Sequence, residues 1–96
     1  MYTPISTPTY DESYKKLIKG HREKEKRAKK AVKLMSIDPF YPSLKSHKVN
    51  TRTFGKKWSS RIASDLRIIW DFDETEEKII ILLAITKHSG SHREYK

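Results

Sequence analysis

The 96-residue sequence contains no cysteine, so disulfide bonds and thiolate metal sites are excluded. It also lacks a long apolar run: the longest, Ile79–Ile85, is far shorter than the ~20 residues that a membrane-spanning helix needs. The segment Met1–Ile5 has neither the basic region followed by an apolar run nor the cleavage site of a signal peptide. These absences predict a cytoplasmic protein without a membrane partner.

Acidic residues are few relative to basic ones. The chain has 21 Lys and Arg against 12 Asp and Glu, a net charge of +9 and a pI near 9.8. Fifteen of the basic residues lie between Lys15 and Lys57, whereas most acids outside that segment fall between Asp71 and Glu77. A basic surface of this kind is typical of a protein that binds nucleic acid, with simple solubility as the alternative.

The length of the chain predicts one domain over residues 1–96. A short strand is expected over Tyr2–Thr7, and the capping-box spacing Thr9–Glu12 predicts the start of a helix that stops at Gly20. A second helix is expected from about Arg22 to Met35, because apolar residues at 28, 31, 32 and 35 form one stripe. The two helices would form a hairpin over about residues 10–36.

From residue 44 onward the pattern is that of strands. Residues 45–49 are expected to be a basic connector entering the sheet. Along the next strand, Trp58, Ser60 and Ile62 are expected on one face and Ser59, Arg61 and Ala63 on the other. Residues 66, 68, 70 and 72 form an apolar face, and Ile79–Ile85 has the continuous apolar character of a strand covered on both faces. The prediction is an α+β fold with an N-terminal strand and a helical hairpin packed on one face of a four-stranded, mainly antiparallel sheet. The sheet core would span about residues 44–86, followed by a C-terminal tail over 87–96.

Three segments of this pattern resemble the RelE/ParE superfamily of toxins. Asp38–Val49 (DPFYPSLKSHKV) is similar to the family's link from helix to sheet, Leu66–Trp70 (LRIIW) to its penultimate strand, and Leu83–His88 (LAITKH) to the end of its last strand. The resemblance implies a type II toxin, and its RelE/YafQ-like branch implies a ribosome-dependent mRNA endonuclease. The implied partners are the ribosome with its mRNA and a cognate acidic antitoxin.

Metal-free RNA cleavage needs a base for the 2′-hydroxyl, an acid for the leaving 5′-oxygen and fixed positive charge for the transition state. Arg67 lies between core positions in an apolar strand, where an unpaired Arg is hard to explain structurally. The resemblance implies that Arg67 binds phosphate and that His88 is catalytic. His92 competes for the role of His88, because Gly90–Tyr95 is similar to the family's terminal Gly-Thr-His pattern.

The resemblance also extends to further positions. Arg61 replaces a His of YafQ-like members, and Asp65 matches a YafQ-like acid, although a turn cap explains Asp65 equally well. The remaining implied catalytic residues are His47 and Tyr95, and the implied phosphate-binding residues are Lys45, Lys48, Lys57, Lys87 and Arg93.

Other interpretations remain open. A metal or other cofactor is not expected, although His88 and His92 have a zinc-compatible i, i+4 spacing and the acids at 71–77 could suggest magnesium rather than a solvated hairpin tip. Trp58 and Trp70 could stack on bases or belong to the core. The alternative functions are a ParE-like protein that inhibits DNA gyrase without cutting RNA, and an inactive homologue that binds only antitoxin or RNA.

Overall fold

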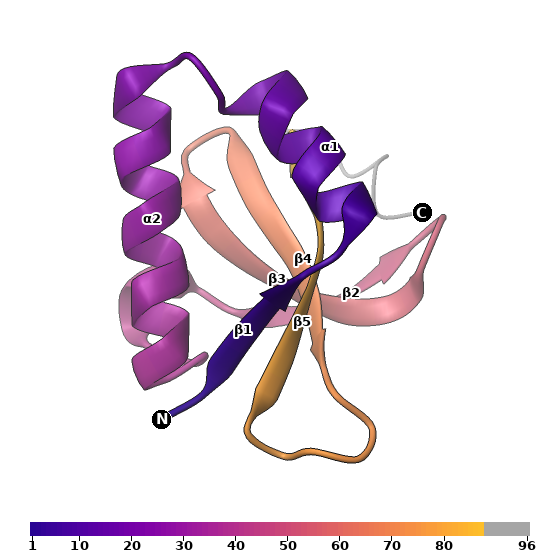
Figure 1. Ribbon diagram of the computed structural model, residues 1–96. Helices are drawn as coiled ribbons and strands as arrows, with labels where there is room; N and C mark the ends of the chain where they lie inside the picture. Colours follow the sequence, from indigo (N-terminus) through magenta and orange to yellow (C-terminus); the bar gives the residue numbers. More distant parts are fainter. Residues whose placement is uncertain (88–96) are drawn as a thin grey trace.

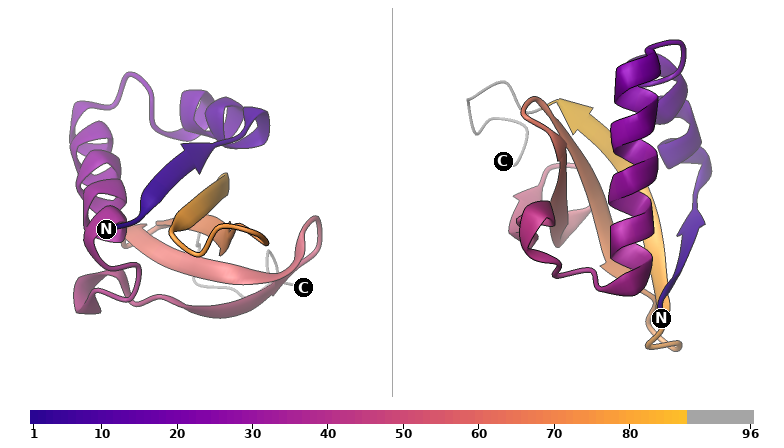
Figure 2. Two further views of the ribbon diagram at one scale, coloured as in Figure 1. Left: turned by 60° about the horizontal axis from the view of Figure 1, so that its bottom comes forward. Right: turned by 90° about the vertical axis from the view of Figure 1, so that its left-hand side faces the viewer.

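The computed structural model describes residues 1–87, in which two helices cover one face of a five-stranded sheet (Figures 1 and 2). The elements follow the order β1 (Thr3–Ser6), α1 (Pro8–Leu17), α2 (Arg22–Ile37), the short 3₁₀ helix η1 (Pro42–Leu44), β2 (His47–Thr51), β3 (Gly55–Ala63), β4 (Leu66–Phe72) and β5 (Ile79–Lys87). The strand order is β1-β5-β4-β3-β2; β1 runs parallel to β5, and the other pairs are antiparallel.

The predicted α+β class is confirmed, but the sheet has five strands rather than four. The segment around His47, predicted as a connector, is itself strand β2. It folds back along β3 through a tight turn in which Gly55 has a φ of +78°. Thr51 closes this turn, because its Oγ1 accepts from the amide of Phe54 at 2.8 Å and donates to the carbonyl of Gly55 at 2.9 Å.

Helix α1 begins two residues earlier than the capping-box pattern predicted. Thr7, not Thr9, is the cap: its Oγ1 accepts from the amide of Tyr10 at 3.2 Å. Pro8 then occupies the first helical position, where its missing N–H costs nothing and its fixed φ suits the helix. The sequence pattern alone did not separate Thr7 from Thr9, because both precede the apolar stripe of the helix. Pro8 favours Thr7 as the cap, since proline suits the first helical position.

Beyond the end of β1, side chains of the α1 N-cap and of α1 itself form hydrogen bonds with the backbone of β5. Strand β1 pairs with β5 only as far as Ser6 and Leu82. Beyond that point, Thr7 Oγ1 donates to the carbonyl of Leu82 at 2.9 Å, and Ser13 Oγ accepts from the amide of Ile85 at 2.8 Å. These bonds satisfy backbone groups that would otherwise lack partners, and they hold the end of β5 against α1.

The core lies between the helices and the sheet. Helix α2 contributes Ala28, Ala31 and Met35, all buried as their spacing predicted, against residues such as Ile68 and Trp70. The helix continues to Ile37, two residues beyond the predicted end, and stops before Pro39, which disfavours helical geometry in the residue before it. Within residues 1–87, no helix is long and apolar enough to cross a membrane.

A chain of hydrogen bonds fixes the segment between α2 and β2 to the sheet. Buried Trp70 donates from Nε1 to Ser60 Oγ at 2.7 Å, Ser60 and Ser46 share a 2.6 Å bond, and Ser46 donates to the carbonyl of Pro39 at 2.6 Å. Because Ser46 donates to Pro39, Ser60 must donate to Ser46. Trp70 is therefore a core residue with a satisfied polar group. Ser46, the third residue in this series of hydrogen bonds, directly precedes His47.

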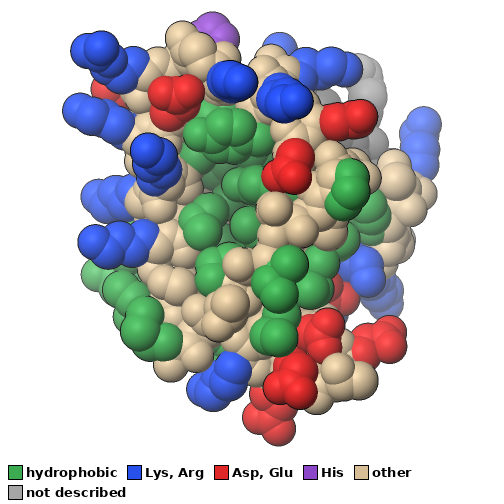
Figure 3. Space-filling view, viewed as in Figure 1, with side chains coloured by type: hydrophobic (Ala, Val, Ile, Leu, Met, Phe, Trp, Pro, Cys, Tyr) green, Lys and Arg blue, Asp and Glu red, His purple; other side chains and the backbone are tan. Residues whose placement is uncertain are grey.

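The charges separate in space (Figure 3). Lys and Arg line the flank of α2, whereas acidic residues gather at the turn between β4 and β5. The carboxylate of Asp73 accepts from the hydroxyl and amide of Thr75 and from the amide of Glu76, and these bonds lower the pKa of Asp73. Asp71 is not in this turn, contrary to the sequence-based expectation, because β4 continues through Phe72.

Candidate functional site

Two predicted arginines lie side by side on the face of the sheet opposite the helices, here called the outer face. Arg61 of β3 pairs in register with Arg67 of β4, and Arg67 pairs with Thr86 of β5. Directly paired residues of antiparallel strands project to the same face, and neighbouring strands lie about 4.8 Å apart. Alternation along β3 and β4 sends Ile62 and Ile68 to the helix side, into the core. The row Arg61–Arg67–Thr86 therefore crosses three strands on the outer face.

Two polar atoms of this row lack partners. Arg67 Nε and Thr86 Oγ1 are both buried, and neither has a hydrogen-bond partner among the described residues. A buried unsatisfied donor costs about 1–3 kcal/mol, so proteins seldom keep one without a reason. An acceptor bound at this point would satisfy a guanidinium donor and a hydroxyl donor together. The pair is thus suited to an oxyanion such as a phosphate.

His47 lies on the same face, two residues along the sheet from the arginine row. It pairs in register with Ser59 of β3, which shares the outer face with Arg61. Its Nδ1 is 2.9 Å from the carbonyl oxygen of Lys45, an acceptor, so in this arrangement Nδ1 carries the hydrogen. In the neutral ring, Nε2 then holds a free lone pair that can accept a proton. The side chain is exposed to solvent.

Lys57 is also on the outer face, but it is paired. Its Nζ lies 3.1 Å from Oδ2 of Asp71, and both side chains are about a third exposed (27% and 31%). The second carboxylate oxygen of Asp71 accepts from the amide of Phe72 at 2.8 Å. The positive charge of Lys57 is therefore largely compensated within the protein, unlike that of Arg67.

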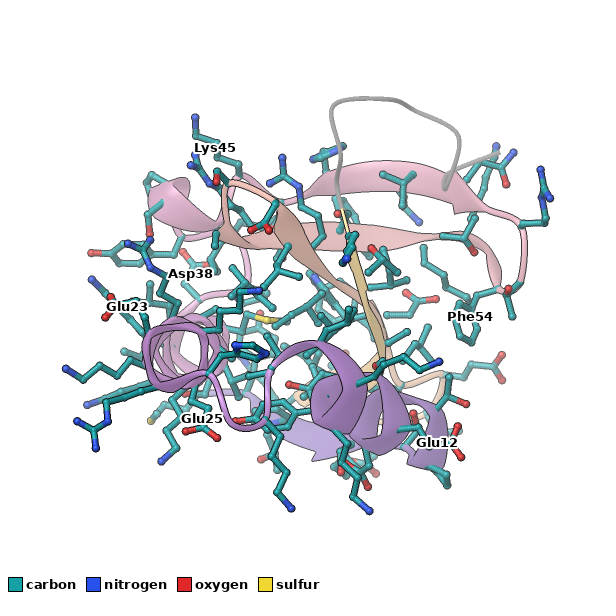
Figure 4. All side chains as sticks on the ribbon, turned by 90° about the horizontal axis from the view of Figure 1, so that it is seen from above. Glu12, Glu23, Glu25, Asp38, Lys45 and Phe54 are labelled. Carbon is teal, nitrogen blue, oxygen red and sulfur yellow. The ribbon has the colours of Figure 1, made fainter. Side chains whose placement is uncertain are left out.

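The remaining predicted lysines are spread around the sheet. Lys45 caps η1 in a left-handed conformation with φ of 49° and is exposed, and Figure 4 shows it on the side of the sheet away from α1. Lys48 lies on the opposite face of β2 from His47, with Nζ 5.0 Å from the ring centre of Trp58. Lys87 ends β5 opposite Leu66 and is exposed. The structure thus does not bring the four described lysines of the predicted phosphate-binding set together.

The other predicted site residues, His88, His92, Arg93 and Tyr95, lie outside the described residues. Asp65 is exposed in the turn between β3 and β4. Thr86 was missed by the sequence analysis, because nothing in a continuous apolar run marks which residue faces Arg67. Only the register across the β4–β5 ladder, which shifts between Ile69 and Trp70, reveals it. Within residues 1–87, no three His, Asp or Glu side chains form a group that could hold a metal ion.

No family model matches the sequence, and no curated protein matches it either. Solved structures do match. A metal-bound toxin from Helicobacter pylori is 21% identical, with a TM-score of 0.70 over 94% of this chain and 98% of that one. YafQ from E. coli strain BL21(DE3) is 12% identical, with a TM-score of 0.69 over 94% of this chain and 97% of that one. The YoeB–YefM complex from Staphylococcus aureus matches at 18% identity, with a TM-score of 0.67 over 92% of this chain and 98% of that one.

These structures are toxins of the RelE/ParE superfamily, so the resemblance inferred from the sequence is confirmed at the level of the fold. The match spans nearly the whole of both chains. At these identities the shared fold is what the comparison establishes. The chemistry of the outer face has to be argued from its own residues.

Proposed function

We propose that the chain is the toxin of a type II toxin–antitoxin pair and acts in the cytoplasm as a ribosome-dependent mRNA endonuclease. The observation that carries this proposal is the buried, unpartnered Nε of Arg67 beside the unpartnered hydroxyl of Thr86. It occurs on the outer face of a fold shared with YafQ and YoeB. A guanidinium that lacks an acceptor on an otherwise folded surface is suited to bind the phosphate of a substrate.

The proposed reaction is attack by a ribose 2′-oxygen on the adjacent phosphorus. A bond forms between the 2′-oxygen and phosphorus, and the bond from phosphorus to the 5′-oxygen breaks. His47 takes the proton of the 2′-hydroxyl on Nε2, the nitrogen left free when Nδ1 donates to Lys45. Arg67, with Arg61 beside it, stabilises the negative charge that grows on the phosphate oxygens. The side chains of the protein supply these roles, so the proposal includes no metal or other cofactor.

The C-terminal tail would supply the remaining groups. In this proposal His88 protonates the leaving 5′-oxygen, with His92 as the competing candidate. Tyr95 stacks on a base or transfers a proton, and Arg93 binds phosphate. The proposal draws on the end of β5, because Lys87 directly follows Thr86 and is the last described residue.

A substrate held on the ribosome suits so sparse a site. His47 is solvent-exposed, so this candidate base does not lie in an enclosed pocket. Much of the reduction in the barrier must then come from a message that is already positioned, as it is in the decoding site. Purified protein is accordingly expected to leave free RNA largely intact.

The proposed antitoxin is an acidic segment that folds onto this protein. A net charge of +9 favours an acidic partner, and the S. aureus YoeB structure was solved in complex with YefM. A hollow of about 340 Å³ between α1 and α2, visible in Figure 3, offers an apolar docking point lined by Tyr10, Tyr14 and Val32. Burial raises the pKa of Tyr10 to about 12, so this wall of the hollow stays uncharged.

The experiment that tests the function is expression in a bacterial host followed by sequencing of RNA ends and mapping of DNA breaks. We expect new RNA ends within translated reading frames, in phase with codons, and intact chromosomal DNA. Double-strand DNA breaks with intact transcripts would identify a gyrase inhibitor instead. Unchanged RNA and DNA, with growth unaffected, would identify an inactive homologue.

A further inference from the structure

A second basic feature lies beside the outer face, at the free edge of β3. Strand β2 pairs with β3 only over Gly55–Ser59, so the last residues of β3 have no strand on that side. Helix α2 and η1 approach this free edge and leave a groove of about 490 Å³. The groove is lined by Glu23, Lys26, Arg27, Lys30, Ala31, Leu34, Ser43, Leu44, Arg61 and Ile62.

The charged lining is almost entirely cationic. Lys26, Arg27 and Lys30 come from α2 and Arg61 from β3, with Glu23 as the single acid. Glu23 lies 3.7 Å from Arg27 in an exposed i, i+4 pair, and Figure 4 shows it on the flank of α2 nearer the Asp38–Lys45 connector. Lys26, Lys30 and Arg61 have no ion-pair partner within residues 1–87. Four cations around one hollow repel one another, a cost that a bound anion removes.

Arg61 belongs to both features. It pairs in register with Arg67 on the outer face, and it also lines this groove because it lies at the free edge. A polyanion that lies across Arg67 can therefore continue past Arg61 into the groove and stay next to cationic side chains along this route. An unbranched chain with a phosphate on every unit fits this arrangement, since Arg61 joins the outer-face arginine pair to the cations of the groove.

We propose that this groove, formed by Lys26, Lys30 and Arg61, is a second binding site for RNA backbone phosphates, next to the site of cleavage. The inference builds on the proposed function by extending the path of the RNA. The apolar floor, made by Ala31, Leu34 and Leu44, gives no base-specific donors or acceptors, so binding there is independent of sequence. The phosphates can belong to the substrate strand or to ribosomal RNA.

The test compares two double variants that remove the same charge at the same i, i+4 spacing. Lys26→Ala/Lys30→Ala empties the groove of two cations, and Lys15→Ala/Lys19→Ala removes two exposed cations of the α1 region. Binding to a fluorescent single-stranded 12-nucleotide RNA is measured by anisotropy over a range of salt concentrations. Each lost phosphate contact reduces the steepness of the plot of log K against log salt by about 0.7. The slope should therefore be about 1.4 less steep for the groove variant and nearly unchanged for the control.

The source of the phosphates follows from two arms of the experiment. Weaker binding of the 12-nucleotide RNA by the groove variant assigns the groove to the substrate strand. A loss confined to co-sedimentation with ribosomes assigns it to ribosomal RNA. Equal losses for both double variants in both assays, or no loss for either variant in either assay, would overturn the proposal. So would an equal loss of binding to a poly-glutamate peptide, because the groove would then be a site for acidic protein.

Failure of this inference is distinguishable from failure of the proposed function. If the wild-type protein cuts translated messages but the two double variants bind both the 12-nucleotide RNA and ribosomes alike, the function holds and the groove assignment fails. If the groove variant alone loses RNA binding while the wild-type protein cuts nothing, the groove holds and the nuclease proposal fails.

Discussion

At the scale of single residues, Arg67 differs from its outer-face neighbour Lys57 because a buried donor of its side chain has no partner. Lys57 is held by Asp71 at 3.1 Å, whereas the buried Nε of Arg67 meets no acceptor within residues 1–87. Folding therefore leaves Arg67 poorly compensated, and binding an oxyanion would repair this. Residues that weaken the free protein in order to serve a ligand are a known cost of function.

Replacing Arg67 should separate activity from stability. We expect Arg67→Met to lower cleavage of translated mRNA on the order of 100-fold or more, as removal of a transition-state donor typically does. Its free energy of unfolding should stay equal or rise by up to about 1 kcal/mol, because the variant removes an unsatisfied buried donor. Urea denaturation and quantified RNA ends measure the two effects. Arg22→Met, in the exposed first turn of α2, should change neither; strong destabilisation by Arg67→Met would make Arg67 a structural residue.

The two histidines of the C-terminal tail are expected to differ in how much each contributes to cleavage. His88→Ala should lower cleavage by about 100- to 10,000-fold if His88 transfers a proton, which is the usual range for a general acid or base. His92→Ala should have a smaller effect. Both variants are compared by growth after induction and by counting RNA ends. Loss of toxicity in His92→Ala alone would shift the catalytic position by four residues, and full activity in both would remove the tail from the mechanism.

At the scale of elements, the connector between α2 and β2 determines where His47 lies. The bonds from Trp70 through Ser60 and Ser46 to Pro39 tie this connector to β3 and β4. The hydroxyl groups of Ser60 and Ser46 each accept one hydrogen bond and donate the next, so loss of either hydroxyl breaks two bonds of the series. The position of a candidate base thus rests on a buried polar chain outside the site.

Breaking that chain at its centre should be costly. Ser60→Ala leaves Trp70 Nε1 without an acceptor in the core and Ser46 without its donor, so we expect a loss of about 1–3 kcal/mol in the free energy of unfolding. Ser64→Ala, in the exposed turn after β3, should change stability by less than about 0.5 kcal/mol. Urea denaturation of both variants measures the difference. An equally small effect for Ser60→Ala would mean that the chain contributes little to stability.

The sequence predicted those features that depend on periodicity. The alternation over residues 66–72 placed Trp70 in the core and Arg67 on the other face, and both expectations agree with the structure. Features that depend on pairing were missed. Strand β2 depends on the turn at Gly55, and the neighbour of Arg67 depends on a register shift in β4–β5. Single-strand patterns contain neither piece of information.

At the scale of the whole molecule, the separation of charge predicts how the protein is controlled. The acids gather at the β4–β5 turn, whereas α2 and the groove beside it are basic. An acidic partner would cover this basic surface and so shield the cations that we propose bind RNA. Control by a folding antitoxin is therefore consistent with the electrostatics.

Co-expression with the neighbouring gene tests this control. We expect an acidic protein that co-purifies with this chain, becomes more ordered on binding and restores growth. Binding should weaken as salt is raised, because charge attraction contributes to it. Circular dichroism of the free and bound partner, with titration calorimetry at two salt concentrations, measures both effects. A neighbour that never co-purifies with an active toxin would contradict the prediction.

The most direct test of the central claim is cleavage of a message on stalled ribosomes, with a single 2′-deoxynucleotide at the position otherwise cut. Wild-type protein should cut the all-ribose message and leave a 2′,3′-cyclic phosphate on one product and a 5′-hydroxyl on the other. The 2′-deoxy message should stay intact, because the attacking oxygen is absent. Equal cleavage of both messages, or products that carry 5′-phosphates, would contradict attack by the 2′-hydroxyl.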